Sequence, residues 1–127
     1  MEQSEIVEML QSPDMFTVPI DTEDVMLMEW AYIHGDTSTV RWALVTASDR
    51  LLNGDPSKRL IGAMKHLLLT AMSDERDARI RITAIAAVEE SGLQMDTPIF
   101  YELIERVHAD PDDRVKNRAL VALMRAE

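Results

Sequence analysis

The sequence contains no cysteine, which excludes disulfide bonds and thiolate metal sites. Glycine and proline are also scarce, with four and five residues in 127, and aromatic residues make up only 5% of the chain. No uncharged apolar run reaches the roughly 18 residues that suggest a membrane-spanning helix. The acidic start, MEQSEIVEML, lacks the basic residues of a secretory signal. We therefore expect a cytoplasmic protein that does not insert into a membrane.

Lysine and arginine are absent from the first 36 residues, which hold nine acids. Residues 37–127 hold fourteen acids and thirteen bases, so most of the net charge of −10 belongs to the first quarter of the chain. This balance argues against binding to nucleic acid or to an anionic membrane, because both require an excess of positive charge. The acidic first quarter either keeps the chain in solution or binds a basic partner.

Alanine, leucine, valine, isoleucine and methionine fill the rest of the chain at helical spacing, and no period-two alternation is sustained. The sequence therefore predicts an all-α fold. Capping residues and prolines mark the expected helix starts, because both fit the first turn of a helix. These starts are Ser4, Asp21–Thr22, Asp36–Thr37, Asp55–Pro56, Ser73–Asp74, Thr97–Pro98 and Asp110–Pro111.

The six main helices group into three antiparallel hairpins at about 22–53, 56–91 and 98–126, because few residues separate the helices within each pair. Residues 1–20 precede them as an acidic helix and an irregular connector that contains Pro13 and Pro19. We expect one domain in which residues 21–127 carry the three hairpins and residues 1–20 lie beside the first hairpin.

An acid in each hairpin turn is followed by an apolar–basic pair, and further apolar residues recur four, five and seven positions after the apolar member of the pair. The three copies are Asp36 with Val40–Arg41, Asp74 with Ile80–Arg81, and Asp110 with Val115–Lys116. This pattern resembles the HEAT and HEAT-like repeat families. The resemblance implies a short α-solenoid whose second helices line a concave face. The copies differ in their turn lengths, and Lys116 stands where the other copies have arginine.

Catalytic and metal-binding motifs are missing: the sequence has no nucleophile elbow, no phosphate-binding glycine loop and no HExxH. His34 and His108 occupy equivalent positions at the ends of first helices, where histidine complements the free carbonyls. We therefore expect no enzyme activity, no cofactor and no metal site.

Nine of the thirteen bases lie on the three expected second helices. They either bind an acidic partner segment on the concave face or are neutralised within the chain, with Arg41, Arg81 and Lys116 forming a ladder to the turn acids. Trp30 and Trp42 are expected in the core, and an exposed tryptophan would be a candidate contact hot spot. The candidate partner-binding residues are Arg41, Trp42, Arg81, Arg114, Lys116, Arg118, Met15 and Phe16.

The repeat pattern and the absence of catalytic motifs favour a non-catalytic adaptor or scaffold that binds another protein. Two other functions agree with the sequence. The acidic first quarter could act as a decoy that occupies the basic site of a nucleic-acid-handling protein. The small size and the apolar stretch around Met15 and Phe16 also suit a structural subunit of a larger assembly, such as a virus particle, and self-association is compatible with the same features.

Overall fold

The computed structural model describes residues 22–53 and 58–126, and this part of the chain is helical, which confirms the predicted all-α class. The helices are α3 (Thr22–His34), α4 (Thr37–Asn53), α5 (Lys58–Met72), α6 (Ala78–Glu90), α7 (Thr97–Ala109) and α8 (Asp113–Met124). None of these helices has the length and apolar character needed to cross a membrane. The predicted helix and connector of residues 1–20, with Met15 and Phe16, lie outside the described residues, as does the expected cap at Asp55–Pro56.

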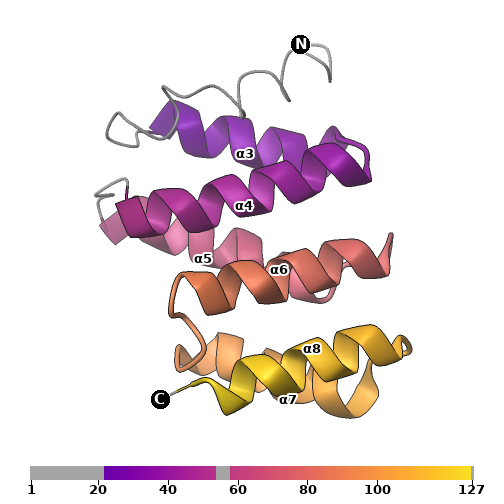
Figure 1. The fold of residues 1–127 in the computed structure, drawn as a ribbon. Helices are drawn as coiled ribbons and strands as arrows, with labels where there is room; N and C mark the ends of the chain where they lie inside the picture. Colours follow the sequence, from indigo (N-terminus) through magenta and orange to yellow (C-terminus); the bar gives the residue numbers. More distant parts are fainter. Residues whose placement is uncertain (1–21, 54–57, 127) are drawn as a thin grey trace.

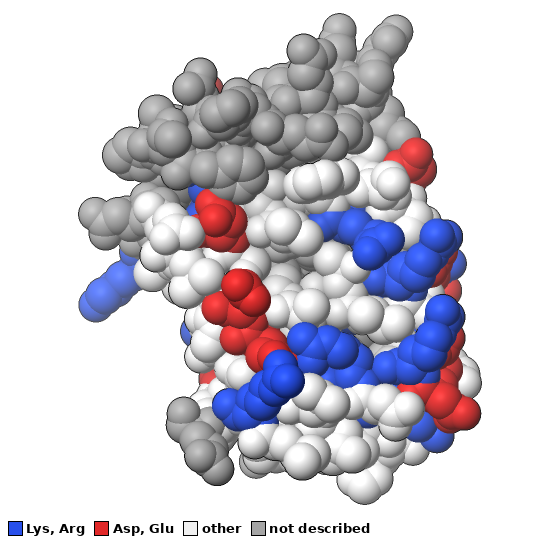
Figure 2. Space-filling model, viewed as in Figure 1, with Lys and Arg blue, Asp and Glu red and all other residues white. Residues whose placement is uncertain are grey.

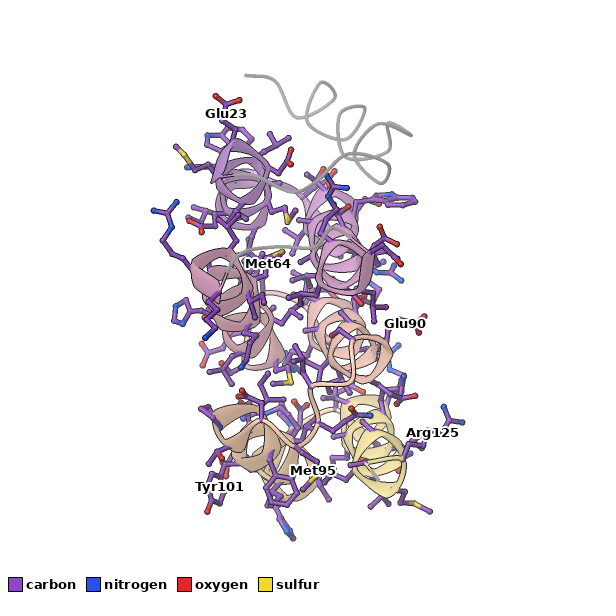
Figure 3. All side chains as sticks on the ribbon, turned by 90° about the vertical axis from the view of Figure 1, so that its left-hand side faces the viewer. Glu23, Met64, Glu90, Met95, Tyr101 and Arg125 are labelled. Atoms are coloured by element: carbon purple, nitrogen blue, oxygen red, sulfur yellow. The ribbon has the colours of Figure 1, made fainter. Side chains whose placement is uncertain are left out.

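The helices lie in two layers, with α3, α5 and α7 in one layer and α4, α6 and α8 in the other (Figures 1 and 3). Within each pair that is consecutive in sequence, α3–α4, α5–α6 and α7–α8, the two helices pack on each other. The pairs follow one another along the length of the molecule, and α6 lies between α4 and α8. In Figure 1, α4, α6 and α8 all begin at one side of the molecule and end at the other.

Small and flexible apolar side chains fill the space between the layers. Leu44, Met64, Leu68, Met72 and Ile85 are fully buried. Alanines of α4, α6 and α8 that follow the predicted apolar pattern are buried as well, namely Ala47, Ala84, Ala87, Ala119 and Ala122, and so is Ala43. Because alanine has a short side chain, neighbouring helices approach closely and leave no room for bulky aromatic groups.

Two expected helix starts are wrong. Asp74 and Asp110 are not the N-caps of α6 and α8; the N-caps are Asp77 and Asp112, each of which accepts a hydrogen bond from the backbone N–H two residues on, and Asp110 is the C-cap residue of α7. Asp74 and Asp110 instead accept from the N–H groups of Arg76 and Asp112 and shape the connecting turns. Aspartate suits both positions equally well, so residue type alone does not separate a turn from a cap.

A buried ion pair links the last two helix pairs. Arg81 on α6 donates from Nε and Nη2 to the two carboxylate oxygens of Asp110, at 2.9 and 3.1 Å, and from Nη1 to the Asp74 carbonyl at 2.8 Å. Asp74 itself accepts from the Tyr32 hydroxyl at 2.6 Å, which links the first pair to the second. Burial and the hydrogen bond to Asp74 raise the pKa of Tyr32 to about 12, so its hydroxyl remains a donor at neutral pH.

Candidate protein-docking groove between α4 and α6

Most of the predicted basic strip is neutralised inside the chain. Arg81 is buried against Asp110, so it is not available to a partner. Arg114 donates to its own helix cap, Asp112, at 2.8 Å, and Arg118 on α8 pairs with Glu89 on α6 at 2.6 Å. For these residues the structure bears out neutralisation within the chain, one of the two alternatives that the sequence left open.

Arg41 and Lys116 differ from the other basic residues predicted to contact a partner. Within residues 22–53 and 58–126, neither of them forms an ion pair. Arg41 is exposed on α4 and donates from Nε to the Thr83 hydroxyl at 2.9 Å. Lys116 is half-buried on α8. Of the predicted ladder of Arg41, Arg81 and Lys116, only Arg81 binds a turn acid, namely Asp110. The three residues therefore do not form one site.

Arg41 and Trp42 lie together at a groove between α4 and α6. Two adjoining cavities of about 300 and 490 Å³ share Arg41, Val45 and Thr83 as lining residues. The other lining residues come from both helices: Ser38, Trp42, Ser48, Asp49, Leu52 and Asn53 on α4, and Ile82, Ala86, Ala87 and Glu90 on α6. Because the α4 residues 41, 45, 48 and 52 recur every three or four positions, they present one continuous helix face to the groove.

Hydrogen bonds hold the two walls of the groove together. The Ser48 hydroxyl on α4 donates to the Ala87 carbonyl on α6 at 3.1 Å, in a buried position. The Thr83 hydroxyl accepts from Arg41 and donates to the Arg79 carbonyl at 2.8 Å. The small side chains of Ala86 and Ala87 leave the space above these bonds open, so the groove has a fixed polar floor and an open top.

The surface of the groove is apolar in its middle and charged at its ends. Trp42, Val45 and Leu52 are 40%, 46% and 51% exposed, so α4 presents three large apolar side chains at the groove. In Figure 2 basic atoms predominate on the side where α4 and α6 begin, with some acidic atoms at its edge, and acidic atoms gather on the side where these two helices end. Such a surface suits a polypeptide segment better than a small molecule, because the groove is open along its length.

Trp42 and Val45 correct the core predicted from sequence. Trp30 is partly buried against the core as expected, but Trp42 faces outward. The apolar position five residues after the apolar member of each pair is buried in one copy, at Ile85, whereas Val45 and Leu120 are each 46% exposed. Ile85 is buried because α6 has a neighbouring helix on both sides, whereas the groove opens beside Val45.

Other surfaces of the described residues also carry exposed apolar side chains, including Leu120, Val121 and Met124 on α8. A second cavity of about 500 Å³ lies on the opposite layer between α3 and α5, and its lining includes Tyr32, Ile33, His66 and Thr70. Within residues 22–53 and 58–126, no three His, Cys, Asp or Glu side chains converge to hold a metal ion. Sequence reasoning did not select Val45, Thr83, Asp49 and Glu90. For the α4 side of the groove, the sequence does carry a signal: apolar residues at positions 42, 45 and 52 form a second apolar face beside the core face of the helix.

Comparison of the chain with protein-family models, curated proteins and solved structures finds no match.

Proposed function

We propose that this protein is a non-catalytic interaction module in which the groove between α4 and α6 binds a segment of another protein. In the proposed architecture, the three helix pairs are antiparallel hairpins that stack as a short HEAT-like α-solenoid. The layered arrangement of α3–α8 and the three apolar–basic pairs support this proposal. In such a scaffold, α4 and α6 belong to successive hairpins and their common face is a natural binding surface.

The observation that carries the proposed function is the exposure of Trp42 and Val45 beside a fixed floor. Apolar side chains that are exposed above a hollow are typical of binding sites, whereas scattered ones are not. Tryptophan in particular contributes large contact area to interfaces and is common among the residues that dominate binding energy. Trp42 is therefore the expected anchor of the interface.

A peptide-display selection on the whole chain tests the proposal. Enriched peptides should bind the wild-type protein and lose affinity for Val45→Asp, because that change places a charge in the apolar middle of the groove. Leu120→Asp is the matched control: Leu120 on α8 has the same 46% exposure and lies outside the groove lining. Binding should therefore survive Leu120→Asp. Failure to enrich any peptide, or equal loss in both variants, would contradict the proposed site.

The substitution Trp42→Ala measures how much Trp42 contributes to the free energy of binding. Truncation of a central tryptophan in an interface costs about 2 kcal/mol or more, which corresponds to a roughly 30-fold weaker dissociation constant. The free energy of unfolding should also fall, by about 1–2 kcal/mol, because the side chain is only 40% exposed and its buried part loses its contacts. Titration calorimetry with a selected peptide and urea unfolding of both proteins measure the two quantities.

A further inference from the structure

Three charged side chains line the groove, and none of them has an ion-pair partner within residues 22–53 and 58–126. They are Arg41, Asp49 and Glu90. Several arginines elsewhere on the same layer are paired with acids, as in Arg79–Asp77, Arg114–Asp112, Arg118–Glu89 and Arg125–Glu89, whereas Lys116 on α8, like the groove charges, has no ion-pair partner in this part of the chain. The groove lining thus holds charges that the described part of the chain does not neutralise.

Asp49 also has unused acceptor capacity. Its Oδ1 accepts from the Asn53 side chain at 3.0 Å, but its Oδ2 is shielded from solvent and has no hydrogen-bond partner among the described residues. A carboxylate oxygen that is shielded from solvent and has no donor destabilises the folded state, because its hydrogen bonds to water are not replaced. A donor from a bound segment would remove this cost.

The signs of the three charges are ordered along the groove. Arg41 lies near the start of α4, Asp49 lies eight residues later, and Glu90 is the last residue of α6. Because α4 and α6 begin at the same edge of their layer, their dipoles add partial positive charge at the Arg41 end and partial negative charge at the other end. Side chains and dipoles therefore make one end of the groove positive and the other end negative.

We propose that the partner segment is bipolar, with a carboxylate at the Arg41 end, apolar residues over Val45 and Trp42, and a basic side chain at the Asp49 and Glu90 end. This inference rests on the proposed function and specifies the chemistry of its partner. It replaces the uniformly acidic segment that the basic strip suggested, because two of the three lining charges are negative. The eight residues from Arg41 to Asp49 span about 12 Å, so the acid and the base stand about eight residues apart in a helical segment or about four in an extended one.

Binding of four synthetic peptides that share one apolar centre tests the proposal. One peptide has glutamates at one end and lysines at the other, the second has glutamates at both ends, the third has lysines at both ends, and the fourth has glutamines at both ends. The bipolar peptide should bind about tenfold more tightly than the glutamine peptide at low salt, and high salt should reduce the difference. The two like-charged peptides should bind more weakly than the bipolar one, because each places like charges together at one end.

Variants of the protein should switch this preference. Arg41→Glu makes all three lining charges negative, so the peptide with lysines at both ends should become the tightest binder. Asp49→Lys combined with Glu90→Lys makes them all positive, so the peptide with glutamates at both ends should become the tightest. Lys116→Glu is the control: it makes the same change in net charge as Arg41→Glu but lies outside the groove lining, and the bipolar preference should remain.

The outcomes separate the two proposals. If the glutamine peptide binds as tightly as the bipolar one and Val45→Asp weakens both, the groove binds segments but the bipolar inference is overturned. A preference that survives Arg41→Glu unchanged would also overturn it. If no peptide binds and the display selection enriches none, the proposed function fails and the bipolar inference fails with it.

Discussion

Arg81 and Asp110 form a buried, bidentate ion pair that joins α6 to the turn between α7 and α8, with N–O distances of 2.9 and 3.1 Å. The Asp110 side chain is fully buried and that of Arg81 is 9% exposed. Arg106 also donates to Asp110, at 3.1 Å, and the third Arg81 bond reaches the Asp74 carbonyl. The Asp110 carboxylate therefore joins α6, α7 and the turn between α7 and α8.

Asp110→Asn should lower the free energy of unfolding by about 3 kcal/mol, because it leaves the guanidinium of Arg81 buried without a carboxylate. Asp112→Asn is the matched control. Asp112 caps α8 in a solvent-accessible position, and asparagine caps helices about as well as aspartate, so this change should cost far less stability than Asp110→Asn. Urea unfolding at neutral pH measures both values, and equal losses in the two variants would contradict the importance of the ion pair.

The same carboxylates make stability depend on pH. Burial raises the pKa of Asp110, but hydrogen bonds from the Asp112 N–H and from Arg81 outweigh it and hold the pKa below the ordinary 3.8. Hydrogen bonds from Arg79 and Arg114 lower the pKa of Asp77 and Asp112 to about 2. A carboxyl whose pKa is lowered by folding stabilises the protein above its unfolded pKa, and this contribution is lost as the pH falls through the folded value.

We therefore expect stability to fall between about pH 4 and pH 2. Asp110→Asn should flatten part of this decline, because the variant has already lost the carboxylate that titrates. Chemical unfolding at a series of pH values checks the prediction. Parallel curves for wild type and Asp110→Asn would show that Asp110 titrates alike in the folded and unfolded states.

Gly35 in the α3–α4 turn lacks space for a side chain. A β-carbon there would lie 2.5 Å from the Ala31 carbonyl oxygen and 2.6 Å from Thr39 Cγ2. Gly35→Ala should therefore cost about 2 kcal/mol, in the range of overpacking strain. Gly62 in α5 offers the contrast, because a β-carbon added there would have no atom within 4 Å. Gly62→Ala should stabilise the helix by about 0.5–1 kcal/mol, and thermal unfolding distinguishes the two signs.

Arg50 on α4 is fully buried, yet it makes one long contact, 3.4 Å from Nη2 to an Asp24 carboxylate oxygen. Its Nε and Nη1 atoms have no hydrogen-bond partner among the described residues. Arg50→Met keeps the apolar stem and removes the charge, so it should leave stability unchanged or raise it by about 1–2 kcal/mol. The Asp24 side chain is 18% exposed, so its carboxylate is not left fully buried by the change. A clear loss of stability on calorimetry would contradict this interpretation of Arg50.

The helices were predictable because capping residues and apolar spacing act locally. α3 and α4 end at His34 and Asn53, as the sequence predicted, and α7 begins at Thr97. The sequence assigns Asp74 and Asp110 as N-caps wrongly, because their carboxylates bind Tyr32 and Arg81, which lie 42 and 29 residues away along the chain. The sequence placed an acid correctly in each turn but could not tell which of two nearby acids points inward.

The groove was harder to foresee than the helices. Trp42 and Val45 fit a helical apolar pattern, and sequence alone could not show that α4 carries two apolar faces of which one remains open. Arg41 was selected, but so were Arg81, Arg114 and Arg118, which bind acids of the same chain. Which base is paired depends on how the helices stack, and that information comes only with the three-dimensional arrangement.

The hydrogen bond from Ser48 to the Ala87 carbonyl and the bond from Arg41 to Thr83 fix the spacing of α4 and α6 before any partner arrives. A binding surface that is already ordered loses little conformational entropy on association, so that loss falls mainly on the incoming segment. A cyclised or otherwise constrained segment should then bind more tightly than a flexible one of the same composition, whereas further stiffening of the groove should gain little.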